Sequence, residues 1–178
     1  MYEGKCIMID GATATELERR GVPQLKNAWN GGGALSHPNT LKEIHKEYVA
    51  LGARVIITNT FATCKHTLED AEQGHNFEDL NSKAVMIARQ ACEELKSTET
   101  LIAGGISYWS FTGNSPSLKV LGENIYEQAL IHKNSGVDLL MLEMMVDIDR
   151  MLITLEAAKE SSLPVWVGLS CTQNLNGS

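Results

Sequence analysis

The feature that most constrains this chain is a series of five short apolar runs, separated by longer segments of mixed polarity. Residues within each run are apolar almost without interruption, whereas a strand with one face in water alternates apolar and polar residues. Continuous apolar strands are typical of a parallel sheet that is covered on both faces. We therefore predict five parallel strands, at residues 6–9, 55–58, 101–104, 137–142 and 165–169.

The segments between the runs have the spacing of amphipathic helices. Apolar residues recur three or four positions apart, as in Leu41, Ile44 and Tyr48, so each segment can bury one stripe on the sheet. Pro38 precedes this stripe and Gly52 follows it, and these residue types are common at helix starts and just after helix ends. The predicted order is strand and helix in repeated alternation.

Alternating strands and helices imply right-handed crossovers between parallel strands. Two architectures have this pattern, an open doubly wound sheet and a closed (β/α)8 barrel, and the pattern alone does not choose between them. A complete barrel takes about 250 residues, so five strands in 178 residues is the rate expected for a barrel cut after its fifth strand. No linker-like or repeated segment divides the chain, which predicts one domain over residues 1–178.

The charge of the chain argues against several partners. It has 22 acidic and 15 basic residues and a formal net charge of -7 at pH 7, which repels phosphate backbones and anionic lipid surfaces. We therefore expect no nucleic-acid and no membrane partner. The amino terminus lacks the basic and apolar regions of a signal peptide, and the most apolar run, 137–146, is too short to span a bilayer. A cytoplasmic location is the expectation.

The four cysteines, Cys6, Cys64, Cys92 and Cys171, lie far apart and form no Cys-x-x-Cys pair. This spacing predicts reduced thiols and neither a disulfide framework nor a zinc ribbon. Cys64 and His66 are two positions apart, but two ligands without partners make a poor metal site. We interpret both as ordinary loop residues.

Polar residues follow every apolar run at the point where its strand is expected to end. Ligands of parallel α/β folds bind at the carboxyl ends of the strands, so these residues are candidates for a site. The candidates are Asp10, then Asn59 and Thr60, then Ser107 and Tyr108, then Glu143, and finally Ser170 and Cys171. Turn formation or helix capping explains any one of them, so the signal lies in the coincidence of all five.

The two carboxylates among these candidates, Asp10 and Glu143, can do the most chemistry. On one rim of a barrel they could hold a substrate ammonium group, or act as acid and base in some other barrel enzyme. Aspartate is also among the best N-cap residues, so Asp10 has the alternative role of capping the helix after it. Glu143 lies between Leu142 and Met144, where an unpaired carboxylate is costly, and this favours a functional role.

Glycines mark two further places. No phosphate-binding motif, G-x-x-x-x-G-K-[ST] or G-x-G-x-x-G, occurs in the chain. Gly11 opens a strand-to-helix turn, and the pair at 104–105 allows close approach of backbone or ligand. The three glycines at 31–33 have no preceding strand and predict a flexible surface loop.

Four sequence blocks carry a family resemblance. They are Asp-Gly-Ala-Thr-Ala-Thr-Glu-Leu-Glu-Arg-Arg-Gly at 10–21, then Trp29, Pro38 and the His-x-x-Tyr of 45–48, then Gly-Ala-Arg-Val-Ile-Ile-Thr-Asn-Thr-Phe at 52–61, and Gly-Val-Asp-Leu-Leu-Met-Leu-Glu at 136–143. In order and spacing these blocks resemble the homocysteine S-methyltransferase family. The third block is the most specific, and the resemblance covers nearly the whole chain.

The resemblance implies a fold and a reaction. The fold would be α/β, a (β/α)8 TIM barrel that is partial here, with about five β-α units. The reaction would be methyl transfer, in which zinc holds the sulfur of homocysteine as a thiolate and that sulfur takes a methyl group from a small-molecule donor to give methionine. Zinc coordination keeps a thiol deprotonated near neutral pH, and the thiolate is the nucleophile. The donor stays open among betaine, S-methylmethionine, a methylfolate or another compound.

Site residues carry over by position. The resemblance implies that Asp10 and Glu143 help to hold the amino group of homocysteine, that Gly11 gives it clearance, and that Asn59 and Thr60 line the pocket. It assigns no catalytic side chain and no metal ligand here, because the family's zinc cysteines follow the sixth and eighth strands. We therefore expect a fragment that lacks the zinc ligands, with an oligomer possible. The alternative is a non-catalytic amino-acid-binding or interaction protein derived from the barrel.

The chain departs from the family pattern in two places. Met144 follows Glu143, where the family usually has threonine. The segment 107–111, Ser-Tyr-Trp-Ser-Phe, keeps an aromatic Ser-Tyr start but lacks the usual Gly-Pro continuation. The first departure alters the polarity expected beside the substrate, and the second bears on the choice of methyl donor.

Overall fold

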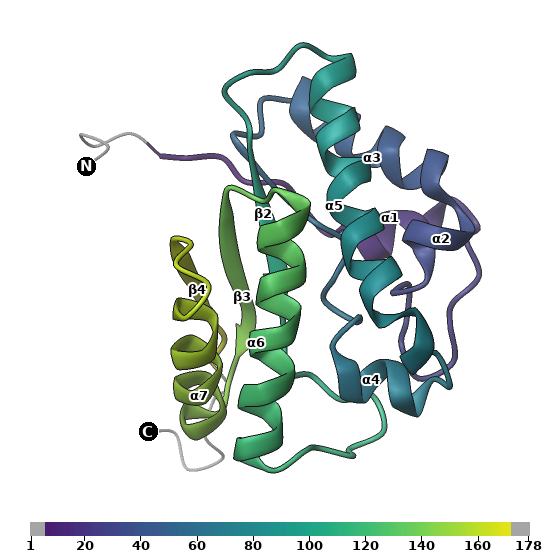
Figure 1. Ribbon diagram of the computed structural model, residues 1–178. Coiled ribbons are helices and arrows are strands. Elements are labelled where there is room, and N and C mark those ends of the chain that lie inside the picture. The colour runs from purple at the N-terminus through teal and green to yellow at the C-terminus, as the bar shows by residue number, and fades with distance from the viewer. Residues whose placement is uncertain (1–5, 172–178) are drawn as a thin grey trace.

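A computed structural model describes residues 6–171, in which helices alternate with parallel strands (Figure 1). The elements are α1 (Thr13–Arg19), α2 (Gly33–Ser36), α3 (Pro38–Ala50), β1 (Val55–Ile57), α4 (Lys65–Asp70), the 3-10 helix η1 (Gly74–Asn76), α5 (Phe77–Glu94), β2 (Leu101–Ile106), α6 (Leu118–Ser135), β3 (Leu139–Met145), α7 (Ile148–Lys159) and β4 (Val165–Leu169). The class is α/β, as predicted. None of the helices in this part of the chain is long and apolar enough to cross a membrane.

The sheet contains four parallel strands in the order β1-β2-β3-β4, so neighbours in the sequence are neighbours in the sheet. Five strands were predicted, and the prediction of the first one, at residues 6–9, was wrong. Within residues 6–9 only Ile9 pairs, in a single parallel bridge to Val55. Two backbone hydrogen bonds flank this bridge, from Arg54 N–H to the carbonyl of Met8 and from Asp10 N–H to the carbonyl of Val55. This contact is too short to form a strand, although it lies where the first strand was expected.

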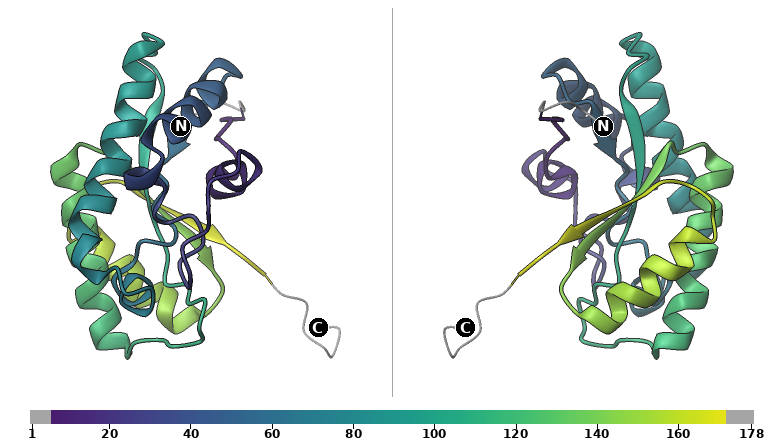
Figure 2. Two further views of the ribbon diagram at one scale, coloured as in Figure 1. Left: turned by 90° about the vertical axis from the view of Figure 1, so that its right-hand side faces the viewer. Right: turned by 90° about the vertical axis from the view of Figure 1, so that its left-hand side faces the viewer.

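The two faces of the sheet differ in what covers them. Alternate residues such as Ile102 and Leu140 point to one face, where they pack in the main core with residues of α5, α6 and α7 (Figure 2). The other face has a smaller apolar cluster that includes Ala103 and Met141, with Trp166 packed against it. No described helix contributes to this second cluster, and the apolar runs are continuous because both faces of the sheet bear apolar side chains.

Helix α3 shows how the predicted helices form. Pro38 is its first residue, where a missing N–H costs no hydrogen bond, and Gly52 lies just beyond its end with a φ of +100°. Leu41 and Ile44 are buried against α1 and α5, and Tyr48 is partly buried beside them. The amphipathic stripe therefore buries the face that the spacing predicts.

The glycines at 31–33 do not form a flexible surface loop. Gly31 and Gly33 are buried, and Gly33 is the first residue of α2. A Cβ on Gly31 would lie 2.8 Å from the carbonyl oxygen of Ala62, and one on Gly33 would lie 2.7 Å from Cδ1 of Leu17. The prediction was wrong because these glycines allow two segments to pass closely, which the sequence pattern does not show.

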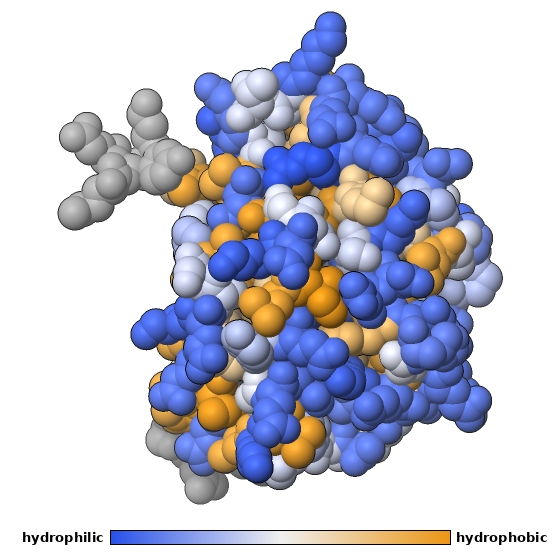
Figure 3. Space-filling model, viewed as in Figure 1, coloured by the Kyte–Doolittle hydropathy of each residue, from blue (hydrophilic) through white to orange (hydrophobic). Residues whose placement is uncertain are grey.

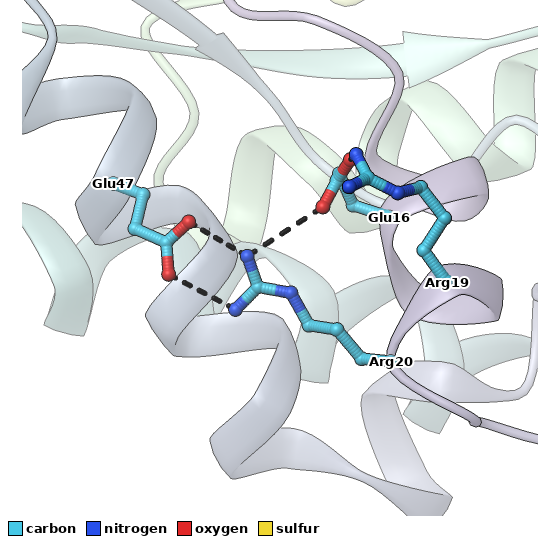
Figure 4. A network of polar contacts seen from close by, with 4 residues as sticks. All are labelled: Glu16, Arg19, Arg20 and Glu47. Carbon is cyan, nitrogen blue, oxygen red and sulfur yellow. Dashed lines mark hydrogen bonds and ion pairs between the residues drawn. The ribbon is translucent and has the colours of Figure 1, made fainter.

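Helices α1 and α3 are joined by a network of charged side chains (Figure 4). The guanidinium of Arg20 binds both carboxylate oxygens of Glu47, at 3.0 and 2.6 Å, and lies 3.6 Å from Glu16, which also pairs with Arg19. Such exposed pairs contribute about 0–1 kcal/mol each. Burial of Leu17 against α3 therefore does more to hold α1, and with it the turn at Asp10, in place.

The face in Figure 3 is mostly hydrophilic. Apolar residues gather toward its lower left, in the region of α6 and α7, and the exposed apolar side chains of these helices include Leu118, Val120, Ile148 and Leu152. Their exposure leaves one flank of this helical layer without an apolar partner among the described residues.

Candidate functional site

The bridge at Ile9 brings Asp10 to the carboxyl end of the sheet. Oδ2 of Asp10 accepts a hydrogen bond from Ile57 N–H at 2.8 Å. Oδ1 is buried and has no hydrogen-bond partner in the described part of the chain. The N-cap of α1 is Ala12, and no side chain caps that helix. The alternative role of Asp10 as a helix cap is therefore wrong, and one of its carboxylate oxygens is left without a hydrogen-bond partner among the described residues.

Glu143 lies near the end of β3, at an irregularity in the sheet. The register of β3 against β4 shifts between Leu142 and Met145, so one residue of β3 is extra, as in a β-bulge. Met144 has a φ of 54°, which is uncommon for a residue with a side chain. Bulges redirect side chains, and here both Glu143 and Met144 line one cavity. Oε1 of Glu143 is buried and, among residues 6–171, has no hydrogen-bond partner.

The two carboxylates are electrostatically coupled. Burial raises the pKa of Asp10 from 3.8 to about 7, although backbone hydrogen bonds oppose this shift. Burial, and then the charge of Asp10, raises the pKa of Glu143 from 4.5 to about 8. Both side chains are partly exposed, but their unpartnered oxygens are buried. A cation placed against them would favour the charged forms and lower both pKa values.

A cavity of about 360 Å³ opens beside Glu143, and Asp10 does not line it, although the adjacent Gly11 does. Its walls come from the start of α1, the loops that follow β1 and β2, and the end of β3. Glu143 lines it together with four aromatic residues, Trp29, Phe61, Trp109 and Phe111. The Phe61 ring meets both Trp29 and Phe111 edge to face, each at a centroid distance of 6.4 Å. We call these four residues the aromatic wall.

Gly11, proposed from the strand-to-helix turn, and Asn59, proposed from a strand end, both line the cavity. A Cβ on Gly11 would lie 2.8 Å from the hydroxyl oxygen of Tyr48, so the glycine lets the turn pack against α3. The Nδ2 of Asn59 donates to the carbonyl of Asn30 at 2.9 Å. This bond joins the loop after β1 to the segment that carries Trp29.

Thr60 is not a lining residue of the cavity, and its side chain is completely buried. Its hydroxyl donates to the carbonyl of Gly105 at 2.7 Å and lies 2.7 Å from Oγ1 of Thr58, which does line the cavity. Gly105 N–H donates to the same Thr58 oxygen at 3.1 Å. A Cβ on Gly105 would collide with Oε1 of Glu143. Thr60 thus supports the backbone on which Glu143 rests.

Ser107 and Tyr108, the candidates at the end of β2, connect loops to one another. Ser107 is completely buried, and its hydroxyl accepts a hydrogen bond from Trp109 N–H. The hydroxyl of Tyr108 accepts hydrogen bonds from the N–H groups of Val146 and Asp147, each at 2.7 Å. These bonds hold the loop after β2 against the loop after β3.

The aromatic wall was missed by the sequence reasoning. In that reasoning Trp29 was only part of a family spacing pattern. Trp109 and Phe111 were noted only because their segment departs from the family pattern. Periodicity reports which residues share a face of an element, whereas these side chains meet because their loops fold toward each other. The sequence feature that could have indicated the aromatic wall was the presence of several aromatic residues in predicted loops, where apolar side chains are otherwise sparse.

Cys64 and His66 are structural neighbours, with Sγ and Nε2 3.7 Å apart. Cys64 precedes α4 and His66 lies within it, so the interpretation as loop residues was wrong for His66. His66 Nε2 lies 3.2 Å from the carbonyl oxygen of Trp109. Burial raises the pKa of the Cys64 thiol to about 11, which disfavours the thiolate that metals bind. Over residues 6–171, no group of three or more His, Cys, Asp or Glu side chains could hold a metal ion.

Comparisons with known proteins give a consistent result. The family model described as homocysteine S-methyltransferase matches residues 7–178. Betaine-homocysteine S-methyltransferase 1 of Bos taurus is 29% identical over 173 residues, which are 93% of this chain and 40% of the relative. S-methylmethionine-homocysteine S-methyltransferase BHMT2 of Pongo abelii is 26% identical over 170 residues, which are 94% of this chain and 44% of the relative.

A solved structure supports the fold. The metallated form of the homocysteine methyltransferase MmuM from Escherichia coli superposes with a TM-score of 0.79 at 21% identity, over 93% of this chain and 63% of that chain. The chain therefore spans about 40% to 44% of the length of these two curated relatives and less than two thirds of the solved one.

Proposed function

Since the chain belongs to the homocysteine S-methyltransferase family, we propose that it forms the substrate-holding part of an enzyme that transfers a methyl group to the sulfur of homocysteine. The relatives named above act on homocysteine with betaine or S-methylmethionine. Because this chain spans only part of their length, the reaction is assigned to the protein of which these residues form a part.

The observation that carries this proposal is the pair of unpartnered carboxylate oxygens, Oδ1 of Asp10 and Oε1 of Glu143. Homocysteine has an ammonium group with three N–H donors, and a buried ammonium needs both charge and hydrogen-bond acceptors. Glu143 lines the cavity, and Asp10, which does not line it, is close enough for its charge to raise the pKa of Glu143; together the two carboxylates supply both. We therefore assign the ammonium group of homocysteine to Asp10 and Glu143.

The aromatic wall favours an onium methyl donor. Betaine is a quaternary ammonium and S-methylmethionine a sulfonium, and both are cations without an N–H or S–H donor at the charged centre. Aromatic faces attract such cations, typically by about 0.5–2 kcal/mol per contact. A buried carboxylate is less well satisfied by these cations, because they offer it no hydrogen bond. We infer that Trp29, Phe61, Trp109 and Phe111 hold the donor and that Glu143 faces the acceptor.

The chemistry would be a single displacement. The sulfur of homocysteine loses its proton and forms a bond to the methyl carbon, while the carbon–nitrogen bond of betaine or the carbon–sulfur bond of S-methylmethionine breaks. The electron pair of that bond stays with the departing dimethylglycine or methionine. The residues described here would contribute orientation, holding acceptor and donor in one cavity, which converts an encounter of two molecules into an intramolecular step.

The fold supports the same proposal. The four strands are parallel and in sequential order, the arrangement from which a (β/α)8 barrel is built. We propose that these strands, with the bridge at Ile9, form part of such a barrel. The family implies zinc, but the described residues do not fit a zinc site: Cys64 and His66 are only two candidate ligands, and both contact the carbonyl of Trp109. No metal ligand is assigned within residues 6–171.

Two measurements test the function. Isothermal titration of this chain with L-homocysteine should show binding that Glu143→Gln weakens by about tenfold or more, because an ammonium–carboxylate bond is lost. Methionine formation should then be assayed with betaine and with S-methylmethionine, for this chain and for any longer product of its gene. Binding without methyl transfer in any product would support the non-catalytic alternative, and the absence of both would refute the proposal.

A further inference from the structure

The loop between β2 and α6 carries half of the aromatic wall, but beyond the buried Tyr108 it has little apolar support. Trp109 and Phe111 are each more than a third exposed, and the residues from 112 to 115 are exposed as well. Gly113 has a φ of +80° and no atom within 4 Å of its Cβ position. A loop with so few buried contacts takes its position from polar bonds.

Helix α4 makes those bonds from both of its ends. Near its start, the hydroxyl of Thr67 donates to the carbonyl of Trp109 at 2.9 Å. At its end, the carboxylate of Asp70 accepts hydrogen bonds from the hydroxyl of Thr112 at 2.5 Å and from the amide of Asn114 at 2.9 Å. These two bonds hold the pKa of Asp70 below its usual value, so the acceptor is charged at neutral pH. They lie on either side of Gly113, immediately beyond Phe111.

Asp70 also holds the segment that carries Trp29, through its main chain. Its carbonyl oxygen accepts a hydrogen bond from Nδ2 of Asn27 at 2.9 Å. Asn27 and Trp29 both have left-handed backbones, with φ values of 64° and 45°. Such a conformation is uncommon for a residue as large as tryptophan and persists only where neighbouring contacts enforce it.

We propose that Asp70 is a positioning residue for the aromatic wall, which sets the spacing between Trp29 and Phe111 and thereby the affinity for an onium methyl donor. This inference rests on the proposed function, because it concerns the donor subsite. Asp70 does not line the cavity and acts only through the two loops that it joins. Its carboxylate and its carbonyl serve different loops, so the two arms can be tested separately.

The test compares two ligands of one shape. Betaine carries a trimethylammonium group, and 3,3-dimethylbutyrate has a carbon in place of that nitrogen and no positive charge. Isothermal titration of the wild-type chain should show tighter binding of betaine. Asp70→Ala should reduce this preference by about tenfold, because cation–π attraction depends on ring placement. Asp70→Asn keeps one acceptor oxygen, so its preference for betaine should lie between those of the wild type and Asp70→Ala.

Matched variants separate positioning from stability. Glu69→Ala removes an equal charge from the same helix without contacting either loop and should keep the preference for betaine. The double variant Thr112→Ala with Asn114→Ala removes both donors from an exposed loop and should reproduce the effect of Asp70→Ala, even if the latter chain fails to fold. Asn27→Gly, which retains the left-handed backbone, should lower the preference through the second arm.

The outcomes are distinguishable. A wild-type chain that binds both ligands equally overturns the onium site of the proposed function and the inference with it. A wild-type chain that prefers betaine, together with loop and Asp70 variants that prefer it equally, overturns the inference alone. Loss of the preference in these variants, with circular dichroism and melting temperature unchanged, supports it.

Discussion

Replacing Glu143 by glutamine should change how stability depends on pH. The folded chain keeps the Glu143 proton up to about pH 8, because burial and the charge of Asp10 raise its pKa, whereas the unfolded chain loses it at about 4.5. Between these values the folded state binds more protons, so the free energy of unfolding falls as pH rises. Glu143→Gln keeps the shape of the side chain and removes this titration.

The size of this change in unfolding free energy depends on the pH range over which Glu143 can be observed. Burial also lowers the pKa of His45 to about 4 and that of His132 to about 3, so below pH 6.5 the unfolded state gains protons that the folded state does not, and stability falls in that direction. In the unfolded chain both histidines are still half protonated at pH 6.5 and become neutral toward pH 8, which offsets part of the fall, but this offset is the same in wild type and Glu143→Gln and cancels in their difference. Each pH unit on the Glu143 titration costs about 1.4 kcal/mol, so across this window the wild-type chain should lose about 2 kcal/mol relative to Glu143→Gln.

Urea unfolding at several pH values between 6.5 and 8 measures this loss. Wild-type stability should fall by about 2 kcal/mol more than that of Glu143→Gln, while Asp10 adds a smaller fall to both proteins. Glu156→Gln, an exposed substitution on α7, should follow the wild type. Parallel pH profiles for wild type and Glu143→Gln would refute the reasoning, since they would mean that Glu143 is ionised in the folded protein throughout.

Three further results are expected. Binding of an amino-acid ammonium at pH 7 should release protons, because the bound cation lowers the pKa of both carboxylates. Calorimetry in buffers of different ionisation enthalpy measures this release, and equal binding heats in all buffers would contradict it. Gly105→Ala should destabilise the chain by about 1–3 kcal/mol through collision with Glu143, whereas Gly113→Ala, strained only in its backbone, should cost about 1 kcal/mol in thermal unfolding. Asn81→Leu should cost about 3 kcal/mol or more, because Oδ1 of Asn81 is the common partner of three buried side chains; a smaller loss would show that these groups find other partners.

The sequence predicted the position of a strand well where its apolar residues form an unbroken run. The run 165–169 coincides with β4, and the runs at 55–58 and 101–104 begin where β1 and β2 begin. Strand β3 continues to Met145, past the predicted end at 142, because the bulge adds a residue and keeps the polar Glu143 inside the strand. An apolar pattern does not report such an irregularity.

The sequence reasoning named the carboxylates of the candidate site but not its aromatic wall. Asp10, Glu143 and Asn59 were proposed because strand ends converge on one edge of a parallel sheet, which is a property of the fold class. Glu143 and Asn59 line the cavity, and Asp10 does not. The contacts of Phe61 with Trp29 and with Phe111 depend on three irregular segments and on left-handed backbone angles at Asn27 and Trp29. Those angles follow from tertiary bonds, such as the one from Asn27 to Asp70, and no local sequence rule predicts them.

The single bridge at Ile9 has a consequence for hydrogen exchange. The segment that carries Asp10 joins the sheet through two backbone hydrogen bonds and the bond from Ile57 N–H to the Asp10 carboxylate. One local opening would therefore expose the amides of Asp10, Arg54 and Ile57 to solvent together. Their exchange rates should be correlated and fast compared with those of β2. A ligand that binds the Asp10 carboxylate should slow all three, so occupancy of the site can be read from amides that the ligand does not touch.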